Sequence, residues 1–351
     1  MLSVKLMKPN QWLLVCKLGQ QKLAHMSRRL RLQHLGPRKD ENENITLVSG
    51  FILLGIETSP ALQTLLFVLF AIIYILTVVG NFTVLVIICL DSRLHTPMYF
   101  FLVNLALIEI LYTTAITPNN LKNILNEDKT ISFVGCFVQM FTFVTLGGSE
   151  CVLLGVMAYD RYVAICHPLL YNTIMNQFVC VLLTLTSWTI GFLDSVVQTT
   201  LTALLPFCHS HLIKHYFCEI PPLLKISCKD THINELVVFF LGGCVIVSSL
   251  LLTLISYVCV IAAVLQIPSQ KGKRKAFSTC SSHLIVVIIF FGTVVFTYLR
   301  PASHSLYGQD HVISLVYGVV TPLLNPIIYC LRNKDFQKAV EKVFFITKRN
   351  L

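Results

Sequence analysis

Seven long apolar stretches dominate this sequence, and they restrict its possible folds more than any other feature. A helix needs about 20 mostly apolar residues to cross the hydrocarbon core of a bilayer, where each backbone polar group must be paired within the chain. The stretches cover residues 62–89, 97–117, 133–159, 178–199, 236–263, 277–299 and 312–331. Because only short connections separate them, the sequence predicts an all-α membrane protein, built as one bundle of seven transmembrane helices.

Composition agrees with a chain that folds in lipid, since 55% of its 351 residues are hydrophobic, 13% are charged and the mean hydropathy is +0.73. In soluble domains about 25% of the residues are charged. We predict an extracellular, largely disordered N-terminal segment (1–61), a transmembrane domain (62–331) and a cytosolic tail (332–351). Apolar residues from Phe336 to Phe344 recur at helical spacing opposite lysines, which predicts an amphipathic tail helix on the inner leaflet.

Basic residues predict the orientation, because short cytoplasmic connections collect Lys and Arg. The connection from Lys271 to Lys275 and the tail both carry basic clusters, so both are predicted to be cytosolic. An odd number of spans then places the N-terminus outside, where the sequon at Asn44 is predicted to be glycosylated. Residues 1–39 conflict with this orientation, because they are basic and contain no acid. Either the bundle overrides this segment, or the segment is poorly ordered and dispensable, with Met26 as an alternative start.

Four cysteines fall on the predicted outer side, where disulfides persist. They are Cys136, Cys208, Cys218 and Cys228. Four cysteines allow three pairings, and the spacing around Cys218 favours the bonds Cys136–Cys218 and Cys208–Cys228. The neighbouring His209, His211 and His215 are of a residue type that binds zinc or copper. Because disulfides would consume the thiols, we predict no metal site in this cluster.

Glu109 and Glu150 are notable because an ionisable group at membrane depth is costly and usually faces the bundle interior. Two facing carboxylates cannot both stay ionised without a cation, so the pair is predicted to share a proton or to hold a sodium ion. Asn81 and Asn325 are predicted to lie nearby and to link the first, second and seventh helices. Such a layer can also be purely structural. Asp194, near a helix end, is expected to be satisfied by backbone or headgroup water.

Four motifs occur in order at the ends of the predicted spans: LHTPMYFFL at 94–102, MAYDRYVAIC at 157–166, KAFSTCSSH at 275–283 and PLLNPIIY at 322–329. With these motifs, the chain resembles olfactory receptors, a group of rhodopsin-like G-protein-coupled receptors, over about residues 44–345. Several long motifs in the right order make a chance match negligible. The resemblance implies a receptor of the cell membrane that binds an odorant, activates a stimulatory G protein and raises cyclic AMP.

The resemblance also implies an activation switch at the cytosolic end of the bundle. Arg161 resembles the arginine that the neighbouring Asp160 holds at rest and that meets the G protein on activation. Tyr257 and Tyr329 resemble tyrosines that support the released arginine, and Pro326 would leave a hinge in the seventh helix. The predicted set is Asp160, Arg161, Tyr162, Tyr257, His283, Asn325, Pro326 and Tyr329.

Three features depart from the patterns of related receptors. Phe291-Gly292 stands where other rhodopsin-like receptors carry the tryptophan and proline of the sixth helix. No acid occurs at the cytosolic start of that helix, so an ion-pair lock to Arg161 is not assumed. Glu109 occupies a position where aspartate is commoner in the family.

The resemblance places a ligand site between the outer halves of the third, fifth, sixth and seventh helices. The predicted lining is Phe143, Val144, Gly147, Gly148, Leu241, Val245, Phe291, Val294, Val295, Tyr298 and Gly318. This lining is almost wholly apolar, with Tyr298 as the chief polar anchor, so it favours a small volatile hydrophobe over an amine. For each of these residues, plain helix packing is an alternative.

Other functional classes fit the sequence less well. A transporter or channel would need repeated halves, broken spans or charged pore residues. An enzyme would need a nucleophile, metal or phosphate motif, and we see none of these in the sequence. We therefore expect no catalytic activity and no nucleic-acid partner. A receptor for amines or peptides remains as a further alternative, and the missing acid at Phe143 or Val144 counts against it.

Overall fold

The computed structural model describes residues 50–55, 59–126, 128–207, 211–298, 314–331 and 336–342. All of them belong to one compact unit, Leu47–Leu351. The predicted glycosylation site Asn44, and Cys208 and His209 of the predicted outer cluster, lie outside the described residues.

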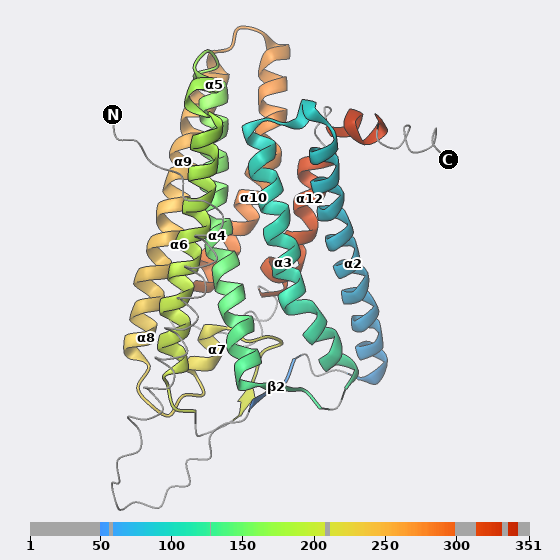
Figure 1. The fold of residues 1–351 in the computed structure, drawn as a ribbon, viewed down its shortest axis with the longest axis vertical. Coiled ribbons are helices and arrows are strands. Elements are labelled where there is room, and N and C mark those ends of the chain that lie inside the picture. The colour runs from blue at the N-terminus through green and yellow to red at the C-terminus, as the bar shows by residue number, and fades with distance from the viewer. Residues whose placement is uncertain are drawn as a thin grey trace, which may run out of the picture. The chain divides into compact units, whose positions relative to one another are not determined.

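The first four predicted stretches form long helices (Figure 1). They are α2 (Pro60–Leu90), α3 (Pro97–Leu125), α4 (Phe133–Cys166) and α6 (Gln177–Ala203). Proline opens α2 and α3, where its missing N–H would have had no helical partner. The Ser132 and Asn176 side chains cap α4 and α6 by accepting a hydrogen bond from the backbone N–H of Gly135 and Val179. Local sequence signals therefore account for where each of these helices begins.

The last three predicted stretches are also helical, with two departures from α-helical geometry. The fifth comprises α8 (His232–Val237), the π-helical η2 (Val238–Gly242) and α9 (Gly243–Gln266). The sixth is α10 (Gln270–Tyr298), and the seventh combines the π-helical η4 (Val316–Val320) with α12 (Thr321–Leu331). Among the described residues, five helices are long and apolar enough to span a membrane, and two shorter apolar helices, His283–Tyr298 and Val316–Ile328, match the sixth and seventh stretches.

Helix α4 lies at the centre of the bundle and packs most extensively against α6, α9 and α3 (Figure 1). In its most apolar window 61% of the residues are buried, whereas the corresponding share in α2 is 11%. An apolar helix that is so exposed in the protein alone is stable only if lipid covers it. The burial pattern therefore places α2 at the lipid-facing edge and α4 in the core.

A small three-stranded sheet, which the all-α prediction did not include, closes one end of the bundle. Its central strand β1 (Gly50–Leu53) pairs antiparallel with β2 (Thr130–Ser132) and parallel with β3 (Leu212–Ile213). Phe51 and Leu53 of β1 are buried in a cluster with the Cys136–Cys218 disulfide. Part of the segment that we predicted to be largely disordered thus packs as a strand, because alternate apolar side chains reach this cluster.

The connections at the opposite end contain the short helices η1 (Ser92–Leu94) and α5 (Tyr171–Ile174). Residues 336–342 of the predicted tail helix are helical. Phe336 and Ala339 are buried in the main core cluster, while Lys338 and Lys342 are exposed. This segment is therefore amphipathic, as its periodicity indicates.

Candidate functional site

A cavity opens beside α4, in the half of the bundle that the sheet closes. Counting the part open to solvent, it encloses about 660 Å³ of empty space. Its walls come from α3, α4, α6, η2, α9, α10 and η4. They are formed by Tyr112, Phe143, Val144, Gly147, Gly148, Cys151, Asp194, Gln198, Val238, Gly242, Val245, Ile246, Phe290, Val294, Tyr298 and Tyr317. A cavity enclosed by helices of a bundle, with mostly apolar walls and a few polar groups, is typical of small-molecule sites.

Seven of the eleven predicted ligand-site residues line this cavity, namely Phe143, Val144, Gly147, Gly148, Val245, Val294 and Tyr298. The other four lie elsewhere. The π-helical turn of η2 leaves Leu241 exposed and brings Val238 and Gly242 to the wall. These shifts arise because a π-helical turn changes the direction in which successive side chains point.

On α10, Phe291 is buried in the core, while its neighbour Phe290 lines the cavity. Val295 is partly buried against the same core cluster. A Cβ at Gly318 would meet the Tyr216 hydroxyl at 3.5 Å, and Gly318 is not among the residues that line the cavity. Neighbouring helical positions are about 100° apart around the axis. If a helix is predicted with a small error in its rotation about that axis, a core residue is assigned to the cavity wall in place of its neighbour.

Two adjacent glycines of α4 have different surroundings. No described atom lies within 4 Å of the position that a Cβ on Gly147 would occupy. A Cβ on Gly148 would instead lie 3.1 Å from the Cα of Gly191 on α6. Gly147 therefore leaves open space at the cavity wall, while Gly148 allows α4 and α6 to approach closely, as small residues do in membrane helices.

Asp194 and Gln198 of α6 give the cavity a polar region that we had not assigned to the ligand site. The Gln198 amide donates to Asp194 Oδ1 at 2.6 Å, and both residues are buried. The described lining contains no Lys, Arg or His. Asp194 therefore has a side-chain amide partner and lies at the cavity wall, which the expected satisfaction by backbone or headgroup water did not include. The i,i+4 spacing of these two polar residues was the available sequence signal.

The loop after α6 contacts two residues of the cavity wall through Glu219. Its carboxylate accepts hydrogen bonds from Tyr298 of α10 at 2.6 Å and from Tyr317 of η4 at 2.9 Å. Tyr298 thus bonds the loop, although we had expected it to be the main polar anchor for the ligand. His215 lies 3.7 Å from the second Glu219 oxygen and 3.1 Å from the Ser314 hydroxyl.

A disulfide holds this loop to the end of α4. The predicted Cys136–Cys218 bond is confirmed, with a Cα–Cα distance of 5.4 Å. Gln139 of α4 adds a further link, since it accepts from the Cys218 backbone N–H at 2.9 Å and donates to the Ala115 carbonyl of α3 at 2.9 Å. Cys228 is also disulfide-bonded, and its predicted partner Cys208 lies outside the described residues.

At the other end of α4, Asp160 holds Arg161. The guanidinium donates to Asp160 Oδ2 at 2.6 and 3.1 Å. Tyr171 of α5 donates to the other carboxylate oxygen at 2.7 Å. Burial, with the nearby Asp160 charge, raises the pKa of Tyr171, so its hydroxyl stays protonated and remains a donor. Asp160 is thus held by two partners, one on each oxygen.

The other predicted switch residues lie in two places. Tyr257 of α9 and His283 of α10 share a hydrogen bond of 2.7 Å inside the bundle. Tyr162 lies nearer the surface and bonds His167 at 3.1 Å. Tyr329 is within α12, and its side chain lies outside the described part of the chain.

The predicted polar layer links α3 and α2 to α12. Asn325 donates to Glu109, and Asn81 donates to the backbone carbonyl of Pro322 at 3.2 Å. Glu109 and Glu150 lie within hydrogen-bonding reach of each other. One oxygen of each acid, together with Asn325 Oδ1, is buried and has no hydrogen-bond partner among the described residues.

Known proteins similar to this chain are olfactory receptors. The family profile described as "Olfactory receptor" matches residues 70–347. "Olfactory receptor 5AP2" of Mus musculus is 50% identical over 303 residues, which are 86% of this chain and 96% of that protein. "Olfactory receptor OR9H1" of Homo sapiens is 48% identical, over 85% of this chain and 97% of that protein. The chain therefore belongs to the olfactory receptor family, and it is a multi-pass G-protein-coupled receptor of the cell membrane.

Proposed function

We propose that this receptor binds a small, mostly hydrophobic odorant in the cavity beside α4 and activates a stimulatory heterotrimeric G protein, which raises cyclic AMP. The observation that supports this most strongly is the cavity itself. Its wall combines aromatic and aliphatic side chains with a few polar groups, the composition typical of small-molecule sites. Burial of carbon surface there would supply most of the binding free energy.

The proposed orientation places the loop that carries Glu219 outside the cell and Arg161 at the cytosol. In this orientation the N-terminal segment 1–61 is extracellular, with Asn44 glycosylated, and the tail 332–351 is cytosolic. The disulfide at Cys218 supports the outer side for the loop, because disulfides persist in oxidising surroundings. The exposed basic residues Lys271 and Arg274 support the cytosolic side for the start of α10. An odorant could then enter from outside while the G protein docks at the opposite end.

The proposed switch is release of Arg161 from Asp160. The buried pair is stable at rest because Arg161 and Tyr171 both donate to the Asp160 carboxylate. A ligand that favours a conformation in which Arg161 faces the cytosol shifts the population toward that state. Glu109 and Glu150 would share a proton or hold a sodium ion, since the two carboxyl groups lie within hydrogen-bonding reach and each has a buried oxygen without a partner among the described residues.

Cells that express the chain with an olfactory stimulatory G protein are expected to raise cyclic AMP in response to members of a diverse odorant panel. Arg161→Ala should abolish the response, because it removes the group that meets the G protein, while the amount of receptor at the cell surface stays unchanged. Lys271→Ala, a change at an exposed lysine near the start of α10, is the matched control and should keep most of the response. An Arg161→Ala receptor that signals as well as the original would refute the proposed switch.

The Asp194–Gln198 pair predicts that the odorant carries a hydrogen-bond donor. An alcohol is expected to act at a concentration about fivefold lower than its methyl ether, because a hydrogen bond contributes roughly 1 kcal/mol. Asp194→Leu should remove this preference and leave the ether response intact, whereas Asp194→Asn, which keeps an acceptor, should retain part of it. Dose–response curves of cyclic AMP measure both effects. A preference that survives in Asp194→Leu would show that the donor contacts another group.

A further inference from the structure

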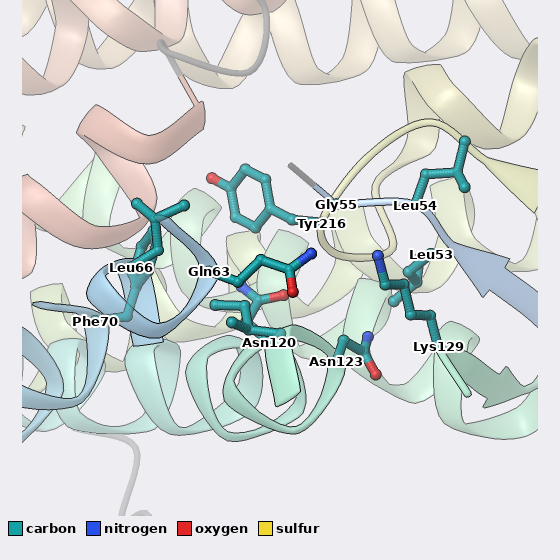
Figure 2. Close-up of a pocket in the computed structure, with 11 residues that line it drawn as sticks. Leu53, Leu54, Gly55, Gln63, Leu66, Phe70, Asn120, Asn123, Lys129 and Tyr216 are labelled. Carbon is teal, nitrogen blue, oxygen red and sulfur yellow. The ribbon is translucent and has the colours of Figure 1, made fainter. Parts of the chain in front are cut away.

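A second cavity lies where strand β1 meets the ends of α2 and α3 (Figure 2). Counting the part open to solvent, it holds about 530 Å³ of empty space. It is lined by Leu53, Leu54, Gly55, Gln63, Leu66, Phe70, Asn120, Asn123, Ile124, Lys129 and Tyr216. Among the described residues, none lines both this cavity and the cavity beside α4. We call the second one the outer cavity.

The wall of the outer cavity contains amide atoms without partners. Asn120 and Asn123 are 6% and 7% exposed. Asn120 Oδ1 and both amide atoms of Asn123 have no hydrogen-bond partner among the described residues. Buried polar side chains are nearly always paired, so these atoms need a partner that enters the cavity. Figure 2 shows the two asparagines in the same lining as Gln63 and Lys129.

The charge of the described lining has a single sign. Lys129 supplies a half-buried ammonium group, and no Asp or Glu is among the described lining residues. The remaining wall is apolar and includes Leu66, Phe70 and Ile124. A ligand that matches this wall has a negative head that accepts hydrogen bonds and a short hydrocarbon part.

We propose that the outer cavity is a second ligand site, which binds a small carboxylate with a hydrocarbon tail. The carboxylate lies against the Lys129 ammonium and the amides of Asn120 and Asn123, and the tail packs on Leu66 and Phe70. Asn123 can donate to the carboxylate through its unpartnered Nδ2. The Asn120 amide can turn so that its N–H₂, in place of its unpartnered oxygen, faces the carboxylate. The bound molecule would connect β1 to α2 and α3.

The test uses the purified full-length receptor in lipid nanodiscs and hexanoate as the probe. Hexanoate is expected to raise the unfolding temperature saturably, while methyl hexanoate, which lacks the charge, has little effect. Lys129→Gln should weaken hexanoate binding about tenfold or more, since it removes the charged partner. Lys122→Gln, a change at an exposed lysine of the same region that does not line the cavity, should leave binding unchanged.

Two further variants locate the probe. Asn123→Leu keeps a side chain of similar size without polar atoms and should also weaken binding. If Asn123→Leu does not fold, Lys129→Gln still gives an independent result. Gly147→Leu, which fills the other cavity, should leave hexanoate binding intact. The proposal is wrong if hexanoate causes no shift, in which case water alone satisfies the amides. It is equally wrong if the methyl ester acts as strongly, if Lys122→Gln matches Lys129→Gln, or if Gly147→Leu abolishes the shift.

Discussion

Replacing Gly191 with alanine is expected to keep most of the receptor from reaching the cell surface. The new Cβ would lie 2.4 Å from both the Thr145 carbonyl oxygen and the Ser149 hydroxyl oxygen of α4, and 2.6 Å from the Ser149 backbone nitrogen. Two of these atoms are backbone, so side-chain rotation cannot relieve the overlap and the helices must separate. Overpacking of this kind costs about 1–3 kcal/mol, and more where the backbone must move. Flow cytometry of an N-terminally tagged receptor measures the surface fraction.

Two variants test this explanation for Gly191. Gly147→Ala adds the same methyl group to α4 where no described atom lies within 4 Å, so it should be delivered normally. Ser149→Ala together with Gly191→Ala should recover only part of the delivery, because the Thr145 carbonyl remains in place. Normal delivery of the single Gly191→Ala variant would contradict the close crossing of α4 and α6.

Replacing Gly147 with leucine is expected to lower odorant potency by about 100-fold or more, or to abolish the response, while the receptor still reaches the surface. The isobutyl group would occupy the space that the odorant needs, and a loss of about 2.7 kcal/mol corresponds to that factor. Folding should tolerate the change, because glycine in a helix interior is less favourable than alanine or leucine. Cyclic AMP dose–response curves, normalised to surface receptor, give the potency.

Gly147→Ala provides the graded comparison for the leucine variant. A single methyl group should change potency only by a small factor, because the added Cβ meets no described atom within 4 Å. If Gly147→Leu responds to the same odorants at the same concentrations, the odorant does not occupy this cavity. Loss of surface delivery in both variants would instead show that Gly147 is needed for packing.

Much of the bundle could be predicted because its determinants are local. A run of apolar residues is recognisable without any tertiary information. The proline of α2 and the caps Ser132 and Asn176 mark helix starts within one turn. The small sheet could not be predicted in this way. Its strands are two to four residues long, and β1 is stabilised by pairing with segments more than 70 residues away.

The candidate site was predicted least well where backbone geometry changes. Leu241 was assigned to the cavity by resemblance to the family, and it is exposed at the π-helical turn of η2 instead. Glu219 was missed because its role depends on tyrosines of two distant helices, which no local pattern reveals. The Cys136–Cys218 pairing could be predicted because only four cysteines fall on the predicted outer side and the spacing around Cys218 favours this bond. Asp194 was misjudged, because its position near the end of a predicted span suggested contact with headgroup water, whereas it lines the cavity.

The hydrogen bond between Tyr298 and Glu219 has a mechanical consequence for α10. Cys218, the neighbour of Glu219, is covalently bound to α4, so the end of α10 at Tyr298 is tethered to the central helix. A tilt of α10 that preserves this tether has its fulcrum near Tyr298. At about 1.5 Å per residue, Gln270 lies about 42 Å from Tyr298 along the axis of α10. A rotation of α10 by roughly 10° about this point would then displace Gln270 by about 7 Å. The α10 residues that line the cavity beside α4 would move far less.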